Sequence, residues 1–234
     1  MWGTNEINMY EEAREILNYL PIEPRTETLY INHLWGAFEA LIEKKEPVRA
    51  FSILPFHLLF MLAIQYKIYR ISAWKNSEYL KILMNCRTYR YEDRIILIRN
   101  APIPDKNGLI SRESSVRNLS KIKEGHIFRL LKVIDVDDLV IKKARILVDI
   151  RGTYAHANGI IEENIESRIN EYLSIFQSVQ LKMPPLNDQV ADKWLADLEQ
   201  GESMADYLEL YLGKEYLCQA DFETGKLGQF SKYL

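Results

Sequence analysis

Cysteine is scarce in this chain, which has only Cys86 and Cys218 among 234 residues. The two lie far apart in the sequence and outside any spacing typical of metal ligands. A small disulfide-stapled protein needs more cysteines than this, so a disulfide framework is not expected. The cysteine content favours a reducing compartment, and we expect a cytoplasmic protein.

A long uninterrupted apolar run is also missing. The most apolar stretch, Ala50 to Ile64, contains Pro55 and His57, and it is shorter than the roughly 20 residues that a membrane span needs. The polar and acidic first twelve residues lack the cationic and apolar parts of a secretory leader. We therefore expect a buried core helix over this stretch, and no membrane partner.

Several catalytic signatures are absent from the sequence. It has no glycine-rich phosphate loop, no GxSxG, no HExxH and no CxxC. The four histidines are scattered, with no carboxylate at metal-ligand spacing, so neither a metal nor a cofactor is expected. We interpret His33 and His57, in apolar helical stretches, as core or boundary histidines. His126 lies at an expected loop–helix junction without distinctive neighbours.

The pattern that is present is helical. Apolar residues make up 47 % and charged residues 27 % of the chain, which suits one globular domain or one domain with an appended piece. Steps of three and four residues between apolar positions predict helices over 28–45, 50–72, 77–85, 136–157, 160–180, 188–200 and 203–219. Within 136–157 the apolar stripe includes Leu139, Ile146 and Ile150. Pro184 and Pro185 are expected to close the 160–180 helix.

These elements predict a mainly all-α fold: a bundle of four to five helices with a short strand-like and loop insertion. The bundle is expected to occupy residues 1–186, with a basic insertion at about 86–125, and an acidic helical extension to follow at 187–234. The run Arg94 to Arg99 (RIILIR) is the one strand-like segment. Pro, Asn and Gly residues after it predict a long connector.

Charge is distributed unevenly along the chain. From Cys86 to Lys123 there are nine Lys and Arg against four Asp and Glu, a net charge of +5. From Asn187 to Leu234 there are four Lys against ten Asp and Glu, a net charge of −6. The basic segment is able to attract a phosphate backbone, or it is simply a solvated loop. The acidic tail is a candidate to mask the basic segment or to contact a partner.

One local sequence carries candidate chemistry, DIRGTYAHANG at residues 149–159. Arg151 and His156 lie near the end of a predicted helix, five residues and about 140° apart, so they are able to flank one cleft. A histidine near its ordinary pKa can take the proton of a ribose 2′-hydroxyl. A guanidinium offers paired donors to the phosphorus oxygens of the transition state.

The RGTYAH string resembles the motif of the HEPN superfamily, in which an Arg is followed after four to six residues by a His near the end of a long helix. The resemblance implies a metal-independent ribonuclease that acts as a homodimer, common in toxin–antitoxin and phage-defence systems. An antitoxin or defence-system protein is then a possible partner. Gly152 replaces the Asn, Asp or His often found after the arginine. Asn158, two residues after the histidine, replaces a Tyr that is found there in one branch of the superfamily.

The ribonuclease hypothesis includes further candidate residues. Tyr154 and Asn158 are candidates to donate hydrogen bonds to phosphate, although an ordinary helix-end Tyr and a capping Asn fit equally well. The candidate RNA contacts are Arg87, Arg90, Arg94, Lys142 and Lys143. Two alternatives stay open. In one, Arg151 pairs with a carboxylate and His156 is stabilised by the helix dipole. In the other, the protein is an inactive helical module that binds RNA or a protein.

Overall fold

The computed structural model describes residues 4–23, 27–100, 116–155, 164–198 and 212–233. Apart from one isolated bridge between Pro21 and Cys218, the regular structure in these ranges is helical, which confirms the all-α prediction. The α-helices are α1 (Thr4–Arg14), α2 (Thr28–Ile42), α3 (Ile53–Trp74), α4 (Asn76–Asn85), α5 (Tyr91–Asn100), α6 (Glu124–Ile127), α7 (Asp138–Ala155), α8 (Ile165–Gln180) and α9 (Pro184–Leu198).

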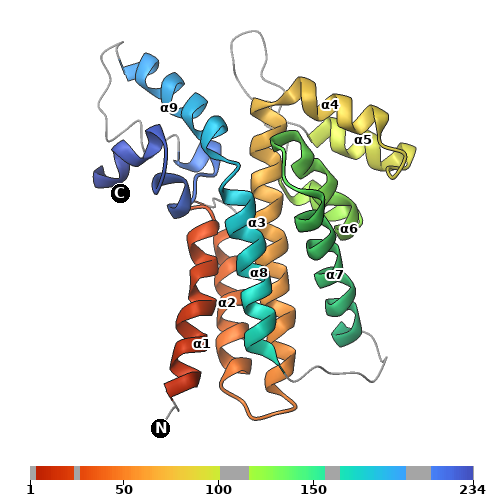
Figure 1. The fold of residues 1–234 in the computed structure, drawn as a ribbon, viewed down its shortest axis with the longest axis vertical. Helices are drawn as coiled ribbons and strands as arrows, with labels where there is room; N and C mark the ends of the chain where they lie inside the picture. The colour runs from red at the N-terminus through yellow and green to blue at the C-terminus, as the bar shows by residue number, and fades with distance from the viewer. Residues whose placement is uncertain (1–3, 24–26, 101–115, 156–163, 199–211, 234) are drawn as a thin grey trace.

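A bundle of α1, α2, α3 and α8 runs along the long axis of the molecule (Figure 1). Helix α7 packs against α3 and α8 on one side of this bundle. Helices α4 and α5 cross near one end on the same side as α7, whereas α9 and the C-terminal segments lie on the opposite side (Figure 1). The described part of the acidic tail is therefore not beside α4 and α5, and this arrangement gives no support to masking of the basic segment.

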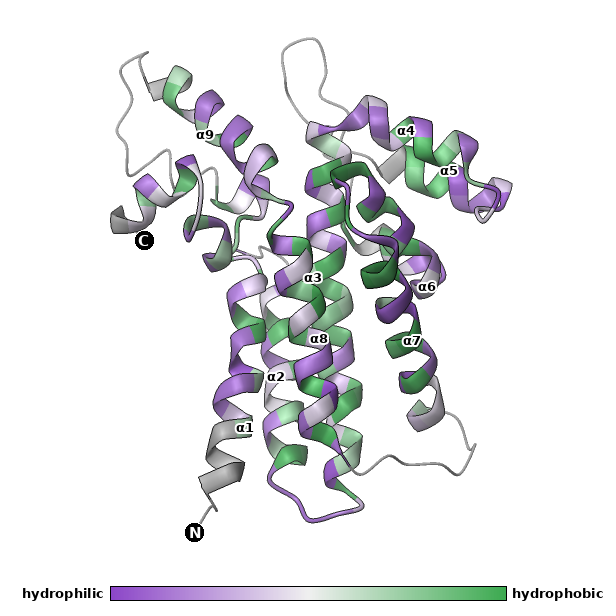
Figure 2. Ribbon diagram, viewed as in Figure 1, coloured by the Kyte–Doolittle hydropathy of each residue, from purple (hydrophilic) through white to green (hydrophobic). Residues whose placement is uncertain are grey.

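Helix α3 is the centre of the core. The stretch Arg49–Trp74 is long and apolar enough to cross a membrane, but 83 % of its most apolar window is buried inside the fold, as in the core helix of a soluble protein. Figure 2 shows the same helix as largely hydrophobic along its length. The Phe60 ring packs edge-on against Tyr172, at 4.9 Å between centroids, and Phe176, at 4.8 Å. The expected buried core helix is confirmed.

The predicted strand at Arg94–Arg99 is wrong, because these residues belong to helix α5. Glu92 and Asp93 lie in its first turn, where carboxylates are favourable. The Arg90 amide donates to Asp93 Oδ2 at 3.3 Å, which is half of a capping box. A lone strand would have left its backbone groups unpaired, whereas the helix satisfies them and buries Leu97. The middle of the expected insertion, residues 101–115, lies outside the described residues.

The apolar stripe expected on α7 is only partly buried. Ile141, Ala144 and Leu147 face the core, whereas Leu139 and Ile146 are 59 % and 45 % exposed. Leu139 and Ile146 are seven residues apart, so they lie on one face of the helix. This face of α7 carries apolar side chains that the described part of the chain leaves exposed.

Helices α8 and α9 begin with recognisable signals. The Asn164 side chain accepts a hydrogen bond from the Ser167 amide at 3.0 Å and caps α8. Residues 160–163 of the predicted helix lie outside the described residues. Pro184 is the first residue of α9, a position where proline fits because no amide is needed there. The expected domain boundary after residue 186 therefore falls inside a helix.

The C-terminal tail is attached to α3 through buried polar groups. Arg70 Nη1 lies 2.6 Å from Asp221 Oδ2, and both side chains are almost fully buried. The other Arg70 nitrogen, Nη2, donates to Asn187 Oδ1 at 2.5 Å. Asp221 also accepts from Asn187 Nδ2 and Gln180 Nε2, at 3.0 Å each. The arginine and the carboxylate lose their water on folding, and each becomes the required partner of the other.

Replacing Asp221 with Asn should strongly destabilise the fold. It would leave Arg70 as a buried cation without a counter-charge, and breaking such pairs costs about 3–5 kcal/mol. The measurement is the free energy of urea unfolding, with the exposed neighbour Glu223→Gln as the matched control. A loss below about 1 kcal/mol, no greater than the control, would contradict this role of Asp221.

Candidate active site

Arg151 is held by a carboxylate from another helix. It lies in the last turn and a half of α7, and its Nη2 atom donates a hydrogen bond to Glu124 Oε2 of α6. Both side chains are about one quarter exposed, at 25 % and 26 %. The pair therefore sits at the edge of the core. The pairing of Arg151 with a carboxylate is one of the two arrangements expected from the sequence.

Glu124 is also linked to the centre of the molecule. The same oxygen, Oε2, lies 3.3 Å from Nε2 of the fully buried His57 on α3. The other ring nitrogen, Nδ1, lies 2.8 Å from the Tyr172 hydroxyl on α8. Tyr172, His57, Glu124 and Arg151 thus form one continuous chain of hydrogen bonds, which we call the Glu124 relay. It joins α8, α3, α6 and α7.

The electrostatics of the Glu124 relay determine its protonation. Burial lowers the pKa of His57, with the hydrogen bond to Glu124 acting in the opposite direction. The hydrogen bond from His57 lowers the pKa of Glu124, and Arg151 adds to that effect against burial. Near neutral pH the relay therefore holds a neutral imidazole beside an ionised carboxylate.

These charge states allow a single tautomer of His57. An ionised carboxylate only accepts hydrogen bonds, so Nε2 of His57 must carry the proton that faces Glu124. Nδ1 is then an acceptor for the Tyr172 hydroxyl, whose pKa burial raises. With every polar atom of the imidazole paired, His57 is the satisfied core histidine that the sequence predicted. Its function in the fold is to position Glu124.

Arg151 keeps donors that the Glu124 relay does not use. A guanidinium has five N–H groups in a fixed plane, and Glu124 takes one at Nη2. The Nε atom is buried and has no hydrogen-bond partner among the described residues. The hydrogen bond to Glu124 at Nη2 restricts how the guanidinium can turn, and the Nη1 group is not engaged by the Glu124 relay. An oriented guanidinium with free donors is suited to binding a phosphate oxygen.

The remaining residues of the motif divide into two groups. Tyr154 is buried, at 6 % exposed, and no described atom lies within 4 Å of a Cβ placed on Gly152. The glycine is thus not required by packing against the described structure. His156 and Asn158 lie outside the described residues, so their position relative to Arg151 stays a prediction.

The five candidate RNA contacts do not form one group. Arg94 is half-buried, and its Nη2 donates to the Cys86 carbonyl at 2.9 Å, which satisfies the end of α4. Arg87 and Arg90 are exposed in the connection between α4 and α5. Lys142 and Lys143 are exposed neighbours on α7 that face different hollows. Arg94 therefore has a structural task, and the other four stay accessible.

A cavity of about 410 Å³ borders Glu124 on the α2 side of α3. Its wall also includes Glu27, Gln65 and Ser120. With two carboxylates and no Lys or Arg in this wall, the cavity is a poor site for a phosphate group. Any phosphate that reaches Arg151 must approach it from another direction.

The sequence motif predicts a role for Arg151, which stays a prediction, and it gives no sign of Glu124. Glu124 lies in the short string EGHI, without a motif or a periodic pattern around it. Only the packing of α6 against α7 brings it to Arg151, and there it also reaches His57 on α3. In the described residues no group of three or more His, Cys, Asp or Glu is arranged to hold a metal ion.

Comparisons with family models, with curated proteins and with solved structures found no match for this chain.

Stability should fall on acidification because of His57. The folded protein lowers the pKa of His57 from its ordinary 6.5, so the unfolded chain takes up a proton more readily. Stabilisation is then complete above about pH 6.5 and is lost as the pH falls toward the folded pKa. We expect urea unfolding at about pH 8 and about pH 5.5 to show this loss in the parent and a smaller loss in His57→Gln.

The matched control is His126→Gln. Burial and nearby cations also lower the pKa of His126, but it lies outside the Glu124 relay. The His126→Gln variant should reduce the pH dependence of the unfolding free energy less than His57→Gln does. An unchanged pH dependence in His57→Gln would show that His57 is not held neutral by its surroundings.

Proposed function

We propose that this protein is a HEPN-like, metal-independent endoribonuclease in which Arg151 and His156 act on the scissile phosphate. The observation that carries the proposal is the orientation of Arg151 by Glu124 at the end of α7. His156 follows five residues later in the sequence. The RGTYAH string provides the remaining support through its resemblance to the HEPN motif.

The proposed reaction is transesterification at an RNA linkage. His156 accepts the proton of the 2′-hydroxyl, whose oxygen attacks phosphorus while the bond to the 5′-oxygen of the next nucleotide breaks. The products are a 2′,3′-cyclic phosphate and a 5′-hydroxyl, after the leaving oxygen takes up a proton. Arg151 stabilises the charge that develops on the non-bridging oxygens. DNA is not a substrate, since it has no 2′-hydroxyl.

The proposal includes a homodimer formed through α7. Leu139 and Ile146 leave an exposed apolar face on the helix that carries Arg151, and apolar faces of this kind are typical of subunit contacts. Pairing of two α7 helices in parallel would bring both copies of the motif to the same end of the dimer, where they could flank one groove. A cytoplasmic toxin or phage-defence effector, neutralised by an antitoxin or another defence-system protein, would fit this activity.

Cleavage of a fluorescent RNA in excess EDTA tests the proposal. We expect the parent to cut RNA but not an oligonucleotide with a 2′-deoxy residue at the cut site. Arg151→Ala and His156→Ala should each lower the rate at least about 100-fold. Arg151→Lys should be intermediate, because it keeps the charge and loses the planar donors.

The controls are His33→Ala and Arg168→Ala, which remove a histidine and an arginine from other helices. Each variant is assayed at a temperature at which its unfolding transition shows it to be fully folded. Light scattering on the same samples reports the dimer, and a monomeric parent that cleaves RNA would remove the dimer from the proposal. Equal rates in the parent and His156→Ala would contradict the assigned chemistry.

A second function, an inactive module that binds RNA, is favoured by one observation. Glu124 already occupies one edge of the Arg151 guanidinium, as in an arginine with a purely structural role. In that case the same assay would show RNA binding without cleavage. Binding through Arg87, Arg90, Lys142 and Lys143 would weaken steeply as salt rises.

A further inference from the structure

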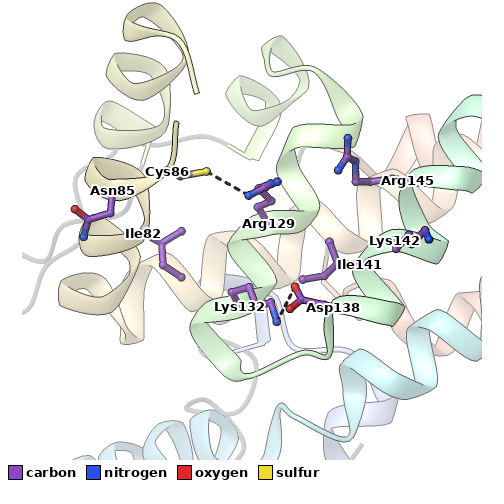
Figure 3. Close-up of a pocket in the computed structure, with 9 residues that line it drawn as sticks. All are labelled: Ile82, Asn85, Cys86, Arg129, Lys132, Asp138, Ile141, Lys142 and Arg145. Carbon is purple, nitrogen blue, oxygen red and sulfur yellow. Dashed lines mark hydrogen bonds and ion pairs between the residues drawn. The ribbon is translucent and has the colours of Figure 1, made fainter. Parts of the chain in front are cut away.

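A basic hollow lies beside the first half of α7, and neither Arg151 nor Glu124 lines it. It has a volume of about 570 Å³ and is formed by the end of α4, the 3-10 helix η5 (Phe128–Ile134) and the first half of α7. We call it the basic pocket. Figure 3 shows the residues that line it: Ile82, Asn85, Cys86, Arg129, Lys132, Asp138, Ile141, Lys142 and Arg145.

The charge of the basic pocket is not balanced by the residues that the structure describes. Four of its side chains are cationic and one is acidic, a net charge of +3. Lys132 is paired with Asp138, at 2.9 Å between Nζ and Oδ1. Arg129, Lys142 and Arg145 have no carboxylate partner among the described residues. Three unpaired cations around one hollow repel each other, and a bound anion would relieve that repulsion.

The charged groups and the volume of the basic pocket indicate which anion fits. Two guanidinium groups and an ammonium match a phosphate group better than a single carboxylate, which would leave most of the charge unbalanced. The volume lies within the range of small-molecule sites and far exceeds one phosphate group. Ile141 lies among the cations in Figure 3, and Ile82 faces the pocket from the end of α4, so the two side chains offer an apolar surface for the rest of a ligand.

We propose that the basic pocket binds a small phosphate-bearing ligand of nucleotide size. Arg129, Lys142 and Arg145 hold the phosphate, and Ile82 and Ile141 contact the organic part. A pocket of about 570 Å³ has room for one nucleotide and not for a stretch of polymer, so the ligand is a mononucleotide-sized molecule.

This site is independent of the proposed ribonuclease chemistry. Arg151 follows Arg145 by six residues, about 9 Å along α7 and on a different face. Neither Arg151 nor Glu124 lines the basic pocket. Binding there is measurable whether or not the protein cleaves RNA.

The basic pocket contains its own reporter. Cys86 Sγ lies 3.9 Å from Arg129 Nη1. Burial opposes ionisation of this thiol, but hydrogen bonds from Thr88 and the charge of Arg129 outweigh it and lower the pKa. The other cysteine, Cys218, is fully buried, and burial raises its pKa to about 12. Alkylation of the folded protein should therefore modify Cys86 and leave Cys218 intact.

The experiment measures the rate of Cys86 alkylation by iodoacetamide, by mass spectrometry of the full chain at constant ionic strength. AMP and ATP are the probes, with inorganic phosphate and a short RNA oligonucleotide as comparisons. We expect saturable protection of Cys86, at least several-fold, by a mononucleotide at millimolar concentration, and weaker protection by inorganic phosphate.

Adjacent lysines on α7 provide the matched variants. Lys142→Ala alters the basic pocket, whereas Lys143→Ala removes the same charge from the hollow between α7 and α8. Lys142→Ala and Arg145→Ala should each weaken protection by about tenfold, because each removes one charge-assisted contact. Lys143→Ala should retain the protection seen in the parent.

Four results would overturn the proposal. They are absence of saturable protection by AMP and ATP, equal protection in Lys142→Ala and Lys143→Ala, protection by the oligonucleotide alone, and inorganic phosphate as effective as the nucleotides. The last would remove the organic part of the ligand from the assignment. None of these results depends on the outcome of the RNA cleavage assay.

Discussion

The arrangement of this protein depends on one constraint: α3 is buried around almost its whole circumference, yet it carries His57, Lys67 and Arg70. A buried polar group without a partner is costly, so each of these side chains requires a partner from another element. His57 takes Glu124 and Tyr172, and Arg70 takes Asp221 and Asn187. These partners fix where α6, α8 and the C-terminal tail dock on the bundle.

The same constraint explains how Arg151 acquires a defined orientation. Glu124 is anchored from inside by a neutral His57 and presents its charge outward to the guanidinium. The buried imidazole of His57 on α3 therefore determines, through Glu124 on α6, how Arg151 is held on α7. For a catalytic role this matters, because a guanidinium acts on a transition state only when its donors already face the reacting oxygens.

Periodicity predicted most of the helices, because long amphipathic segments such as α8 carry their own signal. It failed at 94–99, where a short apolar run fits a strand or a helix equally and the first-turn carboxylates decided the outcome. It also assigned part of the α7 stripe to the core, although Leu139 and Ile146 are exposed. The partners of His57 and Arg70, at positions 124 and 221, depend on three-dimensional packing, and no local pattern marks them. His156 lies outside the described residues, so half of the motif still rests on sequence.

The central claim is that Glu124 and Arg151 act as a unit. A double-mutant cycle on urea unfolding measures this most directly, using Glu124→Gln, Arg151→Gln and the double variant. The account predicts that the double variant loses clearly less stability than the sum of the single variants, with a coupling of about 1 kcal/mol. Additive losses, agreeing within about 0.3 kcal/mol, would show that the carboxylate does not hold the guanidinium.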